Sequence, residues 1–124
     1  MIYNIAAIFI GGGIGAILRY LISYLSKTLF HMPIFGTLTV NLLGCFLIGY
    51  AFGLTSEKIQ TIPPVFNLLI TVGFLGGLTT FSTFGLEGFE LIKNGKIGFA
   101  LLYMTISCIL GLLLVFAGYF LAVK

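Results

Sequence analysis

The sequence predicts an all-α membrane protein with four transmembrane helices, the third of them broken near its middle. Of its 124 residues, 60% are hydrophobic and only 7% are charged, whereas a soluble domain usually carries about a quarter charged residues. The mean hydropathy is +1.22. Residues 32–56, 59–86 and 97–123 contain no Asp, Glu, Lys or Arg. Each stretch is longer than the roughly 20 residues that span a bilayer.

The expected helices form one domain over residues 1–124 and cover about residues 3–26, 36–54, 65–92 and 97–122. The first is apolar except for Arg19, and we expect it to be retained, because it lacks the basic segment and cleavage site of a signal peptide. Breaks are expected at Lys27–Phe35, Thr55–Pro64 and Lys93–Gly95. Both cysteines, Cys45 and Cys108, fall inside apolar spans, which favours packing over a disulfide.

The stretch GFLGGLTTFSTFG, residues 73–85, is the reason to expect a break in the third helix. Its glycines each cost roughly 1 kcal/mol relative to alanine in a helix interior, and hydroxyl side chains follow them. A break frees backbone carbonyls, which are tolerated at this depth only when buried in protein or lining a cavity. Such carbonyls commonly bind a cation. Phe81 and Phe84 are three residues apart, so their positive ring edges share one face, either for packing or for weak contacts to an anion.

Polar side chains inside the other spans are few, and each is costly in hydrocarbon unless it is hydrogen-bonded. Asn41 follows Thr37 by four residues, and Ser107 follows Tyr103 by four, so each pair shares a helix face. Each pair forms either one side of a narrow polar track or a single interhelical hydrogen bond. Arg19 either snorkels to the interface or serves as a clamp or cation at a pore entrance.

The residue types that the predicted spans lack narrow the range of possible functions. Glu87 and Glu90 lie near a helix end and His31 lies in a loop, whereas proton-coupled transport normally needs a titratable group at depth. The sequence has no phosphate-binding glycine loop followed by lysine, no metal-ligand cluster and no nucleophile–base pair. We therefore expect neither an enzyme nor a nucleotide partner, and the thinly spread net charge of +3 does not suggest nucleic acid. Passive ion conduction fits these residues better than coupled transport or catalysis does.

The distribution of lysines favours two orientations. An even number of spans puts both termini on one side with Lys58 and Lys124, and leaves Lys27, Lys93 and Lys96 on the other. Orientation normally follows an excess of Lys and Arg on the cytoplasmic side. The near-tie therefore predicts weak orientation and makes an antiparallel homodimer possible, although such a tie also arises by chance. Glycines spaced by four residues also favour close helix association: Gly11 with Gly15, Gly49 with Gly53, and Gly73 with Gly77.

Along essentially its whole length, the chain resembles the Fluc (CrcB) family of small fluoride channels. The matching segments are GGGIGAILRY (11–20), GTLTVNLLGCFLIG (36–49), GFLGGLTTFSTFG (73–85) and, more loosely, YMTIS (103–107). The two middle segments, in this order and spacing, are highly specific. The resemblance implies a dual-topology antiparallel homodimer in a bacterial cytoplasmic (inner) membrane, with membrane lipid around it. Its two pores would each export fluoride passively down the electrochemical gradient.

The resemblance also implies roles for individual residues. The pore-lining and fluoride-binding residues would be Asn41, Phe81, Phe84, Ser82, Tyr103, Ser107 and Thr39. Arg19 matches an arginine near the vestibule. The backbone carbonyls of Gly76 and Thr79, from both subunits, would hold a structural sodium ion on the dimer axis.

Two alternatives remain open on the sequence. A small proton-coupled multidrug exporter has the same size and topology, but that class relies on a glutamate in its first helix, and this first helix has no acidic residue. A non-transporting membrane assembly subunit would explain the glycines. It would leave Asn41 and the TTFSTF segment without a role.

Overall fold

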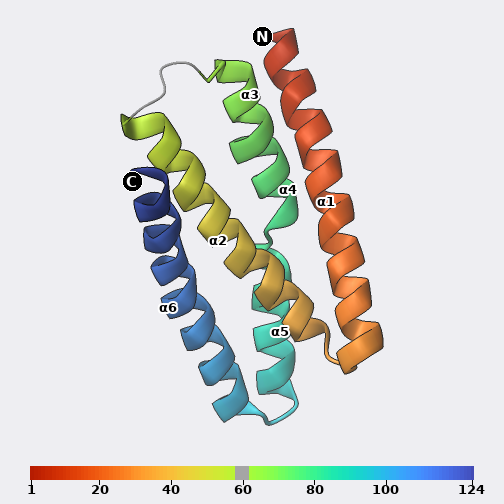
Figure 1. Ribbon diagram of the computed structural model, residues 1–124. Coiled ribbons are helices and arrows are strands. Elements are labelled where there is room, and N and C mark those ends of the chain that lie inside the picture. Colours follow the sequence, from red (N-terminus) through yellow and green to blue (C-terminus); the bar gives the residue numbers. More distant parts are fainter. Residues whose placement is uncertain (58–61) are drawn as a thin grey trace.

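The computed structural model describes residues 1–57 and 62–124, which form four long helical spans and no strand (Figure 1). Three spans are continuous helices: α1 (Ile2–Phe30), α2 (Pro33–Glu57) and α6 (Ile97–Ala122). The third span consists of α3 (Pro64–Leu68), the π-helix η1 (Leu69–Phe74), α4 (Leu75–Leu78) and α5 (Phe81–Lys93). All four spans are long and apolar enough to cross a membrane. The expected all-α architecture with a broken third helix is confirmed.

The first two helices extend beyond the ranges expected from the sequence. α1 continues to Phe30. His31 then adopts the left-handed backbone conformation (φ 55°) and ends the helix. Pro33 then begins α2, because proline lacks only a backbone N–H that would be unpaired in the first turn anyway. Of the break expected at Thr55–Pro64, residues 58–61, including Lys58, lie outside the described residues.

The two termini lie at one end of the molecule, and the turns that join α1 to α2 and α5 to α6 lie at the other (Figure 1). α2 packs along α6 on one side, and α1 packs along the first half of the third span on the other. A small core of Val40, Leu75 and Leu78 lies where α2 meets α4. The second half of the third span, α5, packs against α6 and α2.

The glycines bring helix backbones of the same chain into contact. A Cβ atom on Gly15 would overlap the carbonyl oxygen of Phe74, and one on Gly77 would overlap that of Gly12. α1 and the first half of the third span therefore touch without side chains between them, as membrane helices with small residues do. Every glycine of the spaced pairs meets another helix of its own chain in this way: Gly11, Gly15, Gly49, Gly53, Gly73 and Gly77.

The third span is broken at Thr79 and Thr80, whose backbones are extended (φ −82°, ψ 157° and φ −151°, ψ 117°). The explanation from the glycines is wrong, because Gly73 and Gly77 stay helical and pack against α1. The helix restarts at Phe81, where the Thr80 hydroxyl caps it by accepting a hydrogen bond from the Thr83 N–H (3.2 Å). The break is thus made by a threonine cap, downstream of the glycines.

Candidate functional site

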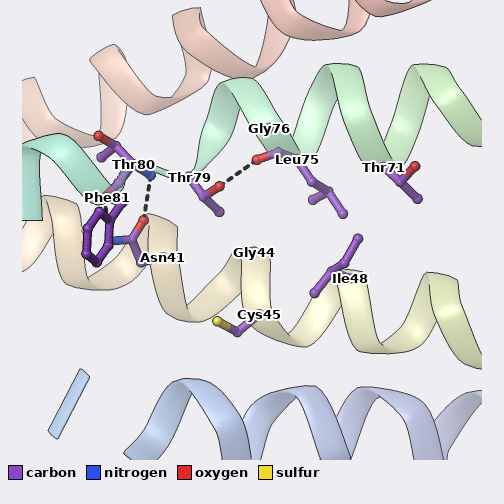
Figure 2. Close-up of a pocket in the computed structure, with 10 residues that line it drawn as sticks. All are labelled: Asn41, Gly44, Cys45, Ile48, Thr71, Leu75, Gly76, Thr79, Thr80 and Phe81. Carbon is purple, nitrogen blue, oxygen red and sulfur yellow. Dashed lines mark hydrogen bonds between the residues drawn. The ribbon is translucent and has the colours of Figure 1, made fainter. Parts of the chain in front are cut away.

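The break is held in place by Asn41 of α2. Its Oδ1 accepts a hydrogen bond from the Thr80 N–H at 2.8 Å, and its Nδ2 donates to the Thr80 carbonyl oxygen at 3.0 Å (Figure 2). One side chain therefore satisfies both backbone groups of a residue that has left the helix. A carboxamide has two N–H donors, so one N–H of Asn41 remains for another partner.

A cavity of about 400 Å³ adjoins the break, between α2 and the first half of the third span (Figure 2). Its lining residues are Asn41, Gly44, Cys45, Ile48, Thr71, Leu75, Gly76, Thr79, Thr80 and Phe81. The last four carbonyls of a helix lack partners within it, and here the Thr80 N–H is bound by Asn41. The backbone around Gly76 and Thr79 therefore supplies carbonyl oxygens beside the cavity.

A buried carboxylate lies on the far side of the break. Glu87 of α5 is 8% exposed; the Thr37 hydroxyl donates to its Oε1 and the Tyr103 hydroxyl to its Oε2, both at 2.7 Å. A buried charge is tolerated only when its lone pairs are satisfied, and hydrogen bonds to a charged group are strong. These two bonds tie α5 to both α2 and α6.

Sequence reasoning missed Glu87, which it placed near a helix end without a role. One signal was available. Glu87 follows Phe84 by three residues, so the two side chains share a helix face. If that face carries a pathway, the carboxylate belongs to it.

Aromatic rings connect the break to this carboxylate. Phe84 is buried, and its ring centroid lies 5.8 Å from that of Phe81 and 5.2 Å from that of Tyr103. Phe81, by contrast, is 84% exposed beside the break. Asn41, Phe81, Phe84, Tyr103 and Glu87 therefore form one continuous series, hereafter the aromatic row, whose ring edges carry partial positive charge.

The aromatic row opens at the end of the molecule that holds the two short turns. A cavity of about 660 Å³ lies there, with Glu87 in its wall. The other polar residues around it are His31, Glu90, Asn94 and Lys96. An ion that leaves this cavity toward the break would meet Glu87 and its two hydroxyl donors first.

The remaining predicted site residues lie outside the row or contribute little to it. The hydroxyls of Ser107 and Thr39 each donate at 2.7 Å to a carbonyl of their own helix, and Thr39 is exposed. Ser82 is exposed, with its hydroxyl 3.4 Å from that of Thr80. Arg19 is half-buried on α1, which supplies no residue to the row. The structure thus joins Asn41, Phe81, Phe84 and Tyr103, and leaves the other four apart.

Within residues 1–57 and 62–124, no three His, Cys, Asp or Glu side chains come together as a metal site. Broken membrane helices can also bind a cation through backbone carbonyl oxygens, and Gly76 and Thr79 carry such oxygens beside the cavity. Such oxygens are the usual ligands of alkali cations in broken membrane helices.

Comparison with known proteins gives a consistent match. The family described as CrcB-like protein, Camphor Resistance (CrcB), matches residues 6–119. The fluoride-specific ion channel FluC of a Hydrogenobaculum species is 44% identical, over 95% of this chain and 96% of that protein. The FluC protein of Serratia proteamaculans is 47% identical, over 86% of this chain and 84% of that protein. FluC 1 of Yersinia pseudotuberculosis is 50% identical, over 81% of this chain and 78% of that protein.

Proposed function

This chain belongs to the CrcB family, and we propose that it is a passive fluoride channel that lets fluoride leave the cytoplasm down its electrochemical gradient. Relatives across its length carry the name fluoride-specific ion channel. The observation that carries the proposal is the aromatic row, which leads from the amide of Asn41 at the break, past two phenylalanine rings and the phenol of Tyr103, to Glu87 in the wall of the cavity of about 660 Å³.

The chemistry of the row suits fluoride. Fluoride is small and strongly hydrated, so a narrow pore must replace its water with hydrogen-bond donors. The remaining N–H of Asn41 and the edges of Phe81 and Phe84 are such donors, and the row contains no lysine or arginine. Conduction needs binding that is favourable enough to enter and weak enough to leave. Neutral donors meet both conditions, whereas a fixed cation in the row would hold the anion.

Glu87 limits how strongly the row binds an anion. Its two oxygens accept the hydroxyl hydrogens of Thr37 and Tyr103. An anion that passes Phe84 must compete with the carboxylate for these hydrogens. The two hydroxyls therefore donate hydrogen bonds to the anion only transiently, and they donate to the carboxylate again once the anion has moved on.

The channel functions as an antiparallel homodimer with two pores, in a bacterial cytoplasmic (inner) membrane. Phe81 is 84% exposed beside the break, so the row of a single chain is open to the surroundings there. A second copy would close it. The sequence supports two orientations, because its five lysines are divided three against two between the two expected sides of the membrane.

The break also fits a structural sodium ion between the two copies. The carbonyl oxygens of Gly76 and Thr79 would hold it, and nothing lies within 4 Å of the position that a Gly76 Cβ would take. A second copy could therefore approach the backbone closely at this point. When bound, the ion would supply a fixed positive charge that keeps the broken ends together.

Fluoride efflux from liposomes that contain only the purified protein tests the proposal. We expect rapid fluoride loss without a proton gradient and no loss of chloride from matched chloride-loaded liposomes. Efflux that requires a proton gradient would instead identify a coupled exporter. No efflux from well-folded dimers would identify an assembly subunit.

A further inference from the structure

Charged and titratable side chains of both signs line the cavity of about 660 Å³ beside Glu87, hereafter the mouth cavity. They are Glu87 and Glu90 of α5, Lys96 of the turn that joins α5 to α6, and His31 of the turn that joins α1 to α2. The two turns lie at the same end of the molecule (Figure 1). The other residues that line the cavity are uncharged, so these four groups set its electrostatic potential.

His31 lies at the edge of the mouth cavity, outside the membrane-spanning helices, and is exposed. Its backbone N–H donates to the carbonyl oxygen of Lys27 at 3.1 Å, which ties the residue to the end of α1. The side chains of Lys27 and Lys93 are exposed and do not line the cavity. α2 has no charged residue before Glu57. The two glutamates and the lysine named above are therefore the charged groups that share the cavity with His31.

The net charge of the mouth cavity depends on the imidazole of His31. Two carboxylates and one ammonium group give its wall a net charge of −1 while the imidazole is neutral, and 0 once it is protonated. Histidine is the residue type that changes charge between about pH 5 and 8, whereas carboxylates and lysines ordinarily keep their charges there. A negative wall repels an anion, and a neutral wall does not. Protonation therefore removes a repulsion of fluoride.

We infer that His31 is a pH-sensitive residue that sets how fast fluoride passes the mouth cavity, with faster passage when its imidazole is protonated. The inference rests on the proposed function, because this cavity is a mouth only if the aromatic row conducts. The sign suits export, since hydrogen fluoride enters cells from acidic surroundings. In an antiparallel dimer the two mouth cavities face opposite sides of the membrane, so each pore responds to the pH of one side only.

Fluoride efflux from liposomes with the same pH inside and outside tests the inference. The ionic strength is kept near 0.01 M, where the Debye length is about 30 Å. We expect wild-type efflux to be about twofold faster at about pH 5.5 than at about pH 8, the effect of one unit charge about 8 Å from an ion in water. Equal wild-type rates at the two pH values would overturn the inference. So would a difference that persists at about 1 M salt, where the Debye length is about 3 Å.

Two variants separate His31 from the other groups of the cavity. His31→Asn removes the titration and suits the turn, because asparagine adopts the left-handed conformation more readily than most residues. We expect it to show the slow rate at both pH values. Glu90→Gln removes one negative charge from the wall and should give the fast rate even at about pH 8. Wild-type pH dependence in His31→Asn would overturn the inference, because another group would then titrate. If His31→Asn fails to elute as wild type on gel filtration, an unchanged rate in Glu90→Gln would overturn it instead.

A planar bilayer tests which side each pore senses. Acidifying one side alone should raise the fluoride conductance about half as much as acidifying both sides, because only one of the two mouth cavities faces that side. The full increase from one side, or no increase, would overturn the inference. Absence of fluoride conduction at both pH values would refute the proposed function and the inference with it. Conduction that does not depend on pH would refute the inference alone.

Discussion

The side chain of Asn41 binds both backbone hydrogen-bonding groups of Thr80, across 39 positions of the chain. The same residue also begins the aromatic row, beside Phe81 (Figure 2). The break that positions the phenylalanines and the donor available to an anion therefore depend on one carboxamide. Its orientation is fixed, because only Oδ1 can accept from the Thr80 N–H and only Nδ2 can donate to the Thr80 carbonyl.

Asn41→Asp is expected to abolish fluoride efflux and to lower stability. The second carboxylate oxygen would face the Thr80 carbonyl, and losing the hydrogen bond there costs about 1–3 kcal/mol. The negative charge would also repel an anion at the start of the row. Efflux from liposomes and the thermal unfolding midpoint in detergent measure the two effects. Asn4→Asp adds the same charge in the first turn of α1 and should change neither; wild-type efflux in Asn41→Asp would remove Asn41 from the pathway.

Phe81→Ile and Phe84→Ile should both reduce fluoride efflux but differ in stability. Each keeps apolar bulk and removes a ring edge, a loss of about 1 kcal/mol or roughly fivefold in rate. Phe84 is 7% exposed, so its replacement also leaves a poorly filled site in the subunit, whereas Phe81 is 84% exposed. Efflux and unfolding midpoints separate the two effects, with exposed Phe89→Ile as the control. Undiminished efflux in both variants would refute the role of the ring edges.

Glu87→Gln should destabilise the protein by about 1.5–3 kcal/mol, the value of hydrogen bonds to a charged acceptor. The carboxylate accepts from both Thr37 and Tyr103, and an amide nitrogen cannot accept from either. Fluoride efflux should fall as well, because Tyr103 would lose the bond that orients it against Phe84. Glu90→Gln, one turn along the exposed face of α5, should leave the unfolding midpoint unchanged. Equal midpoints for the two variants would contradict the buried pairing.

Gly15→Ala should lower stability by about 1–3 kcal/mol through overpacking. The added methyl group would overlap the carbonyl oxygen of Phe74, a backbone atom that cannot move by itself. Gly13→Ala is the matched control, since nothing lies within 4 Å of its added methyl group and alanine favours helix. Thermal unfolding of the two variants provides the comparison. A Gly15→Ala protein as stable as Gly13→Ala would mean that α1 and the third span are not in backbone contact.

The four spans and the position of the interruption follow from the sequence because they depend on local composition. Uncharged stretches set the spans, and the TTFSTF segment marks the interruption. The cause of the break could not be predicted locally. Gly73 and Gly77 are required by the approach of α1, and the backbone of Thr80 is satisfied by a side chain from α2. Both are tertiary interactions between distant segments.

The candidate site could likewise be predicted only in part from the sequence. Shared helix faces correctly suggested that Asn41 and Tyr103 point at neighbouring helices. Helical serines and threonines, however, often bond to the carbonyl four residues back, as Ser107 and Thr39 do here. Their spacing therefore says little about a polar track. Glu87 was missed because its two donors come from helices that are 50 and 16 residues away along the chain.

The zero-current voltage of a planar bilayer that contains the purified protein tests the central claim most directly. Fluoride is placed on one side and an equal concentration of chloride on the other, with the same cation on both sides. A passive pore selective for fluoride predicts a large voltage, negative on the side that receives fluoride. A voltage near zero with measurable conductance would mean that the pore passes both anions alike, or passes cations. Either result would contradict the fluoride selectivity proposed for the aromatic row.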